Sequence, residues 1–152
     1  MRKGLLLTLV AGIALVATQA LASDTKHLTG HLSSQAVTGP DCTSPVGLCT
    51  AGRLIGGIHG EFEFTGTSLT PSSTPGVFFY TGTIVVHTAK GDLTCTDAGA
   101  YSFAPTGEVV DLCTITGGTG ELAGATGSIQ ISGVFTFDGG GDSDYAARLV
   151  LP

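Results

Sequence analysis

The sequence predicts an all-β domain, because apolar and polar residues alternate, turn-forming residues recur at short intervals, and no amphipathic helix follows residue 22. Glycine supplies 24 of the 152 residues, and it adopts the positive φ angles of tight turns more readily than other residues do. This length predicts one domain. We therefore expect strands joined in sequence order by short turns.

Residues 1–22 have the three parts of a cleavable signal peptide. Arg2 and Lys3 supply the positive charge, residues 5–16 are apolar, and Ala20-Leu21-Ala22 has the small-x-small pattern of a cleavage site. The mature chain is expected to begin at Ser23. The apolar run is short for a membrane span, and an uncleaved anchor is the alternative.

Charge and composition exclude some classes of partner. Cleavage leaves four basic and twelve acidic side chains, so the net charge changes from −6 to −8. A chain this acidic, without a basic cluster, has no electrostatic footprint for nucleic acid or for an anionic membrane surface. No second long apolar run follows the signal, so we expect a secreted or periplasmic protein with no membrane association after cleavage.

The four cysteines all lie in the mature chain, and an even number in an exported protein indicates disulfides. Three pairings are possible. We favour Cys42–Cys49, which closes a short loop, and Cys95–Cys113, which joins two strands that follow each other in sequence. Metal binding by the cysteines is the competing interpretation, and the absence of a C-x-x-C spacing argues against it.

The alternation predicts about eight strands. They cover residues 26–32, 53–66 and 77–89, a strand from residue 92 that continues over 100–103, and residues 109–116, 128–138 and 143–151. The connections are residues 35–49 and 67–76, the turns Lys90-Gly91 and Pro105-Thr106-Gly107, the Gly-rich residues 117–127, and residues 139–141. We expect an N-terminal strand and disulfide-closed loop over 23–50 and a barrel over 51–152, with 23–152 folding as one unit.

The side chains on one face of these strands form the expected interior. A two-residue Lys90-Gly91 loop would pair Ala89 with Asp92 and Val86 with Cys95. That pairing places Asp97 on the same face as the apolar residues. The side chains expected to line or fill the interior are Phe62, Phe64, Val86, Leu93, Ile129, Ile131 and Phe135.

Sequential strands with short turns favour an antiparallel meander. A closed eight-stranded barrel removes the exposed edges that such a meander would have, and a β-sandwich is the alternative. Eight strands leave room for packed side chains or for one small ligand.

The Gly-rich segment carries a family resemblance. It reads Gly-Gly-Thr-Gly-Glu-Leu-Ala-Gly-Ala-Thr-Gly over residues 117–127. It resembles the signature of bacterial secreted proteins with an allene oxide cyclase barrel-like or dirigent-like domain. The matching residues are Gly117, Gly118, Thr119, Gly120, Leu122, Ala125 and Gly127, with supporting matches from Gly91 to Phe135. The resemblance implies an eight-stranded antiparallel barrel, and a homotrimer as in many plant relatives.

The plant relatives in this group cyclise a fatty-acid epoxide or guide the coupling of phenolic radicals. No motif here matches their catalytic residues closely enough to transfer a role. If this chain is an enzyme, the resemblance implies a cyclase or isomerase.

Two groups of acidic residues are candidate catalytic positions. Glu61 and Glu63 would form a paired-carboxylate site if their face lined the barrel, but burying two carboxylates is costly, and we expect them in water. Asp97 is expected on the core face, where a carboxyl group needs partners. Tyr101, itself a catalytic candidate, or Arg148 would supply them.

Metal sites are not expected. Asp138, Asp142 and Asp144 flank three glycines, which resembles a calcium loop but occurs only once, so a plain hairpin is preferred. His27 and His31 are four residues apart, which suits a helix, whereas in a strand their side chains lie roughly 13 Å apart. We therefore predict no metal and no cofactor.

Three functions remain open at this level. The first is a secreted barrel that binds a small hydrophobic or aromatic ligand. The second is a cyclase- or isomerase-type enzyme that shapes a hydrophobic substrate, with Asp97 or Tyr101 as the polar group. The third is a structural or interaction protein of the cell exterior, whose barrel is filled by side chains. The volume inside the barrel discriminates among them.

Overall fold

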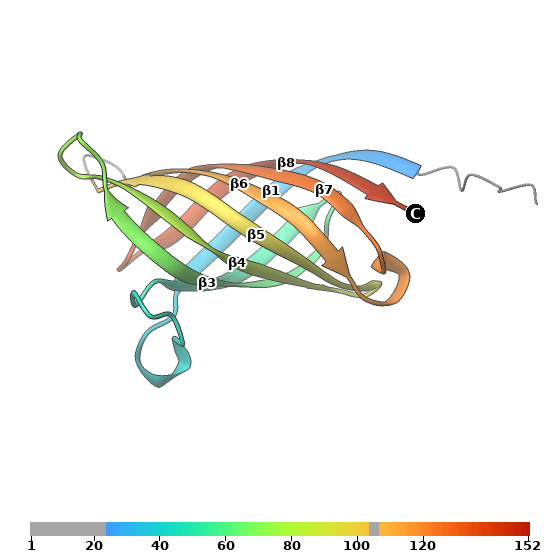
Figure 1. Ribbon diagram of the computed structural model, residues 1–152, viewed down its shortest axis with the longest axis horizontal. Coiled ribbons are helices and arrows are strands. Elements are labelled where there is room, and N and C mark those ends of the chain that lie inside the picture. Colours follow the sequence, from blue (N-terminus) through green and yellow to red (C-terminus); the bar gives the residue numbers. More distant parts are fainter. Residues whose placement is uncertain (1–23, 104–106) are drawn as a thin grey trace, which may run out of the picture.

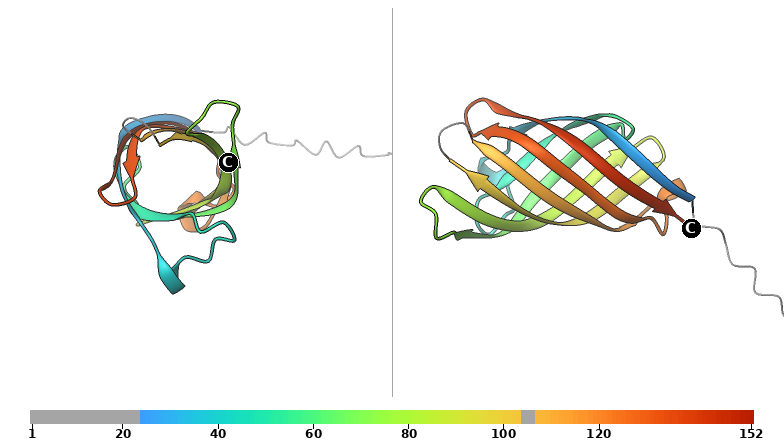
Figure 2. Two further views of the ribbon diagram at one scale, coloured as in Figure 1. Left: turned by 90° about the vertical axis from the view of Figure 1, so that its left-hand side faces the viewer. Right: turned by 90° about the horizontal axis from the view of Figure 1, so that it is seen from above.

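Eight antiparallel strands form a closed barrel in the computed structural model, which describes residues 24–103 and 107–152. The strands are β1 (Asp24–Ala36), β2 (Cys49–Gly56), β3 (Gly60–Pro71), β4 (Val77–Thr88), β5 (Gly91–Ser102), β6 (Glu108–Gly118), β7 (Thr126–Thr136) and β8 (Gly140–Leu151). Each strand pairs with the next, and β1 pairs with β8 to close the ring (Figures 1 and 2). The predicted barrel is confirmed, and the sandwich alternative is excluded.

Two predicted features lie outside the described residues. They are the signal peptide over residues 1–22, and Pro105 and Thr106 of the predicted turn. In the described part of the chain, no helix is both long and apolar enough to cross a membrane.

One predicted strand is two strands in the structure. Residues 53–66 include the end of β2, a turn after Gly56, and the start of β3. The turn is hidden in the sequence because the inward positions Leu54, Ile58 and Phe62 keep the same even spacing across it. Gly56 has a φ of 125°, a backbone conformation that favours glycine. The expected continuation from residue 100 belongs to the single strand β5, which ends at Ser102, so Phe103 lies beyond the strand.

The β4–β5 hairpin turns one residue earlier than predicted. Its loop is Ala89-Lys90, and Thr88 pairs with Gly91 while Val86 pairs with Leu93. The predicted register is therefore wrong by two residues, although every side chain stays on its predicted face because strand side chains alternate with a period of two.

The half of the barrel near the C-terminus is filled with side chains. Leu54, Val86, Leu93 and Ile129 are each at most 2% exposed. Tyr145 reaches from β8 to the β2–β3 turn, where its hydroxyl donates to the carbonyl of Ile58 at 2.9 Å and accepts from the same residue's N–H at 2.7 Å. This half is a packed core, which we call the packed half.

Both predicted disulfides are present. Cys42–Cys49 closes the loop before β2, with the Cα atoms 5.6 Å apart. Cys95–Cys113 joins β5 to β6 on the inner face, also with a Cα separation of 5.6 Å, and both residues are fully buried.

The charged side chains of the described strands lie mostly on the outer face. Arg53 pairs with Glu61 at 3.3 Å, Lys26 with Asp24 at 3.4 Å, and both pairs are well exposed. Surface pairs of this kind contribute little to stability. Their placement nevertheless leaves the basic groups outside the barrel, where they cannot form ion pairs with acidic side chains of the interior.

Candidate ligand-binding site

The end of the barrel opposite the C-terminus contains a cavity of about 100 Å³. Its lining residues lie toward the ends of the strands that the β3–β4 and β7–β8 hairpins join. These hairpins are at the left of Figure 1. Its aromatic and aliphatic walls include Leu32, Phe62, Phe64, Ile84, Phe103, Val109, Ile131, Phe135 and Phe137. We call this part of the barrel the cavity half.

Aromatic rings surround the mouth of the cavity. Phe103 and Phe137 stack with their ring centroids 6.0 Å apart, and they are 47% and 51% exposed. Tyr101 packs edge-on against both rings, and its hydroxyl donates to the carbonyl of Phe135 at 2.9 Å. The mouth is therefore apolar and partly open to solvent.

Several polar side chains interrupt the apolar lining. Tyr80 on β4, Asp97 on β5 and Asp111 on β6 lie on neighbouring strands, and Ser34, Thr50, Tyr101 and Ser143 add hydroxyl groups. The hydroxyl of Tyr80 donates to Oδ1 of Asp111 across β5. Gly99 is the residue paired with both of them, and a Cβ atom there would overlap the Tyr80 ring and the Asp111 carboxylate. The missing side chain of Gly99 thus makes room for this hydrogen bond.

Asp97 is the buried carboxyl group without a matching partner. It is 4% exposed, it faces the cavity, and its Oδ1 atom has no hydrogen-bond partner. Its neighbours across the ladders are Gly82 and Cys113, neither of which offers a strong donor side chain. Most buried polar side chains in proteins are hydrogen-bonded, so this atom requires an explanation.

Burial changes the protonation of this group of residues. Burial, and then the charge of Asp111, raise the pKa of Asp97 to about 8. Burial raises the pKa of Asp111 to about 6, against the opposing effect of the Tyr80 hydrogen bond. Burial and the charge of Asp111 also raise the pKa of the Tyr80 hydroxyl. At neutral pH, Asp97 therefore keeps its proton while Asp111 is mainly ionised, and the cavity holds one acid and one acceptor.

All seven apolar residues predicted for the interior point inward, but they fall in different halves. Phe62, Phe64, Ile131 and Phe135 line the cavity. Val86, Leu93 and Ile129 fill the packed half, where no ligand can reach them without displacing the core.

The catalytic candidates are likewise separated. Asp97 and Tyr101 both line the cavity. The expected partners of Asp97 are wrong, because the Tyr101 hydroxyl bonds to a backbone carbonyl and Arg148 is exposed on the outer face. Glu61 and Glu63 are exposed in water, as expected from the cost of burying them.

His31, Asp142 and Asp144, for which no metal site is expected, lie on the outer face. His31 contacts Asp142 at 3.1 Å and Asp144 at 3.3 Å across the β1–β8 ladder. These hydrogen bonds raise the pKa of His31. The contacts are ion pairs on the exposed face and join the two strands that close the barrel.

Sequence reasoning missed Tyr80 and Asp111. A signal for both exists in the alternation of strand side chains. Tyr80 lies four residues before Ile84 and Asp111 lies two residues before Cys113, so each shares the inward face of that neighbour. Asp111 was hidden because Glu108 and Asp111 both resemble surface residues in a weakly apolar segment.

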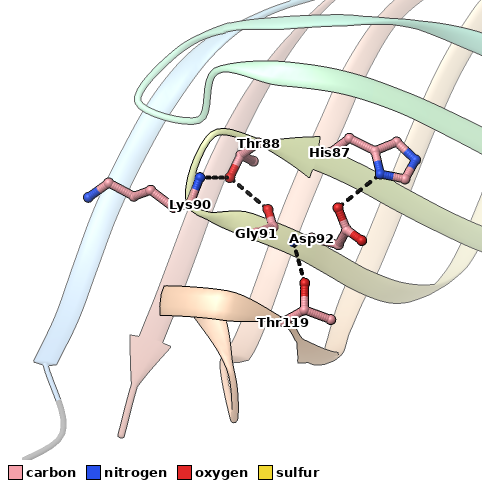
Figure 3. Close-up of polar contacts among 6 residues, drawn as sticks. All are labelled: His87, Thr88, Lys90, Gly91, Asp92 and Thr119. Carbon is pink, nitrogen blue, oxygen red and sulfur yellow. Dashed lines mark hydrogen bonds and ion pairs between the residues drawn. The ribbon is translucent and has the colours of Figure 1, made fainter.

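The Gly-Gly-Thr-Gly motif lies at the opposite end from the cavity. In Figure 3 it packs against the β4–β5 hairpin, where the backbone N–H of Asp92 donates to the Thr119 hydroxyl at 2.9 Å. Gly91 has a φ of 126°, and any side chain there would meet the carbonyl of Thr119. Side-chain bonds of Thr88 hold the same turn, with its hydroxyl donating to Gly91 O at 2.7 Å.

The remaining motif residues close this end of the barrel. Leu122 is 6% exposed, and Ala125 is fully buried beside it. Gly127 pairs with Leu149 near the start of the β7–β8 ladder, where a Cβ atom would overlap the neighbouring strand. Gly117, Gly118 and Gly120 belong to the backbone segment that precedes these residues. We call residues 117–127 the Gly-rich plug. The motif is therefore structural in this chain and contributes nothing to the cavity.

Comparisons with known proteins find distant similarity to solved structures. The chain matches no family model and no curated protein. Among solved structures, it is similar to the pterocarpan synthase dirigent protein GePTS1, with a TM-score of 0.39 and 14% sequence identity over 88% of each chain.

Proposed function

We propose that this protein is an exported barrel that binds a small, largely apolar ligand in the cavity half. The observation that carries the proposal is the unpartnered Oδ1 atom of Asp97 inside a largely apolar cavity. Leaving such an atom buried and unbonded costs about 1–3 kcal/mol. A ligand with a matching polar group would recover that free energy.

The cavity suits a ligand of limited size. A dry engineered cavity of about 150 Å³ in another protein binds benzene. The cavity here is about 100 Å³, so its enclosed part suits one ring or a short aliphatic group. A longer ligand would extend through the mouth, past the exposed rings of Phe103 and Phe137. Binding sites are commonly apolar clefts with a few polar groups that set orientation, as in this cavity.

Export is supported by independent features. The N-terminal residues have the pattern of a signal peptide, and the two disulfides are typical of proteins in an oxidising compartment. A secreted or periplasmic ligand-binding protein accounts for both features.

The proposal is tested by titrating the mature chain with benzyl alcohol and following the amide signals by NMR. We expect the shifts to concentrate on β4, β5 and β6 around the cavity. Ile131→Phe fills the cavity and should weaken binding about tenfold or more. Ile55→Phe makes the same substitution on the outer face, where Ile55 is 53% exposed, and should leave binding unchanged.

If Ile131→Phe fails to fold, Ser143→Leu fills the cavity from β8 and serves the same purpose. Equal binding by the filled and unmodified proteins would reject the cavity as the site. The absence of any binding by the unmodified protein would reject the proposed function.

A second candidate function is favoured by the protonation of Asp97. A carboxyl group that keeps its proton at neutral pH can act as a general acid toward a bound substrate. This supports an isomerase or cyclase, in which the cavity also excludes water. A ligand retained by the purified protein should then be a product, whereas Asp97→Asn should retain its isomer, with equal mass and a different chromatographic retention. Identical retained ligands would reject this candidate.

A further inference from the structure

The described interior of the barrel contains acids but no base. The four described basic side chains, Lys26, Arg53, Lys90 and Arg148, are all exposed on the outside. All four histidines of the chain are exposed as well. Asp97 and Asp111 therefore share an apolar cavity without a cationic side chain to balance them.

We propose that the ligand of the cavity is a small organic cation, namely an amine attached to an aromatic or aliphatic group. This inference rests on the proposed ligand-binding function and specifies its ligand class. The ammonium group would lie between Asp97 and Asp111, and the apolar group would lie among the aromatic side chains of the cavity half.

The geometry of the acids favours an ammonium group. Asp111 already accepts one hydrogen bond, from Tyr80, and Asp97 has the unpartnered Oδ1 atom. A primary ammonium has three donors, so it can bond to both carboxyl groups at once. Hydrogen bonds between charged partners are roughly twice as strong as neutral ones.

The walls of the cavity add a second attraction. Phe62, Phe64 and Phe135 line the space that the acids face. Aromatic faces attract cations, and the attraction increases when both groups are removed from water. The chain's net charge of −6 also favours the approach of a cation over that of an anion.

Neutral and anionic ligands fit the same cavity less well. An alcohol can bond to one carboxyl oxygen but leaves the charge of Asp111 unbalanced. A carboxylate ligand would be repelled by the charge of Asp111, and the Tyr80 hydroxyl already donates its hydrogen bond to that residue. The cavity therefore discriminates by charge among ligands of equal shape.

Binding of an amine should release a proton. Burial keeps the proton on Asp97 in the free protein, with a pKa of about 8. A bound cation favours the ionised carboxylate and so lowers that pKa. The heat of binding will then depend on the buffer, which a purely apolar association would not show.

The test compares three ligands of nearly equal shape by isothermal titration at about pH 7.5, where benzylamine is cationic, benzyl alcohol is neutral and benzoate is anionic. We expect benzylamine to bind about tenfold more tightly than benzyl alcohol, and benzoate to bind least. Titrations in phosphate and in Tris should give different heats for benzylamine and equal heats for benzyl alcohol.

Two variants locate the preference, and one controls for net charge. Asp111→Asn and Asp97→Asn should each reduce the preference for benzylamine about tenfold while benzyl alcohol still binds. Glu63→Gln removes a carboxylate from the exposed outer face and should leave the preference intact. Continued binding of benzyl alcohol shows that a variant is folded.

The outcomes separate the two proposals. Equal affinity for benzylamine and benzyl alcohol, or tighter binding of benzoate, would overturn the cationic ligand and leave the proposed function standing. A benzylamine preference that survives both Asp variants would place the amine elsewhere and overturn the inference. Binding of none of the three ligands would overturn the proposed function together with the inference.

Discussion

The two halves of the barrel share the same eight strands and the same alternation, yet only one of them is filled. In the packed half, Leu93 and Ile129 are each 1% exposed, and the Tyr145 hydroxyl spans to the β2–β3 turn. In the cavity half, aromatic side chains surround about 100 Å³ of space that two carboxyl groups share. The comparison teaches that an inward position in a barrel is not by itself a binding position.

The difference also separates stability from function. Aliphatic side chains that interdigitate contribute most of the free energy of folding in a small domain. The cavity half forgoes such contacts and buries polar groups at a cost. We interpret the packed half and its Gly-rich plug as the scaffold that keeps the cavity half open.

Two isoleucines on β7 give the largest expected difference between the halves. Ile129→Ala empties part of the packed half and should lower the free energy of unfolding by about 3–4 kcal/mol. Ile131→Ala, two residues away on the same face, enlarges an existing cavity and should cost about 1–2 kcal/mol, because fewer packed contacts are lost. Urea unfolding monitored by circular dichroism measures both, and equal losses would mean that the halves are packed alike.

The two disulfides should differ by a smaller amount. Loop-closure entropy predicts a loss of about 3 kcal/mol for the double Cys→Ala variant of Cys95 and Cys113, and about 2 kcal/mol for that of Cys42 and Cys49. The first bond lies in the inner wall, and the second holds only the β1–β2 loop. Thermal unfolding of the two double variants tests this order. A greater loss of stability from the Cys42 and Cys49 variant would show that the bond in the β1–β2 loop stabilises the fold more than the bond in the inner wall.

The pH dependence of stability isolates the cavity. The folded-state pKa of Asp97 is about 8, above the value of 3.8 for a free side chain. The folded protein holds this proton more tightly, so the contribution of Asp97 to stability is greatest below about pH 4 and declines as the pH rises toward 8. Asp97→Asn should flatten this decline and be more stable than the unmodified protein by on the order of 1–2 kcal/mol at about pH 8.5.

Unfolding midpoints in urea at several pH values measure this effect. Asp111 contributes a decline of the same sign between about pH 4 and 6, because burial raises its pKa to about 6. The variant should therefore retain only this lower part of the decline. A decline that persists unchanged up to pH 8 in the variant would show that Asp97 is not the responsible group.

Much of the wall could be predicted from residue alternation. The inward placement of Asp97 follows from the spacing of Leu93 and Cys95, and it survived a register error of two residues because side chains repeat with that period. The Cys95–Cys113 pairing follows from the adjacency of their strands. The turn after Gly56 could not be predicted, because its flanking apolar residues keep the spacing of a continuous strand.

The sequence by itself predicted most of the strands and the face on which most strand residues lie, and it favoured the closed barrel and the two observed disulfides, since these depend on local periodicity and on short connections. Only the tertiary structure decided how far along the barrel each inward residue sits, because that position depends on the stagger between all eight strands. That stagger brings Tyr80 and Asp111 together across Gly99 and places Val86 and Phe64 in different halves. The cavity is therefore a property of the closed ring, and no single strand contains it.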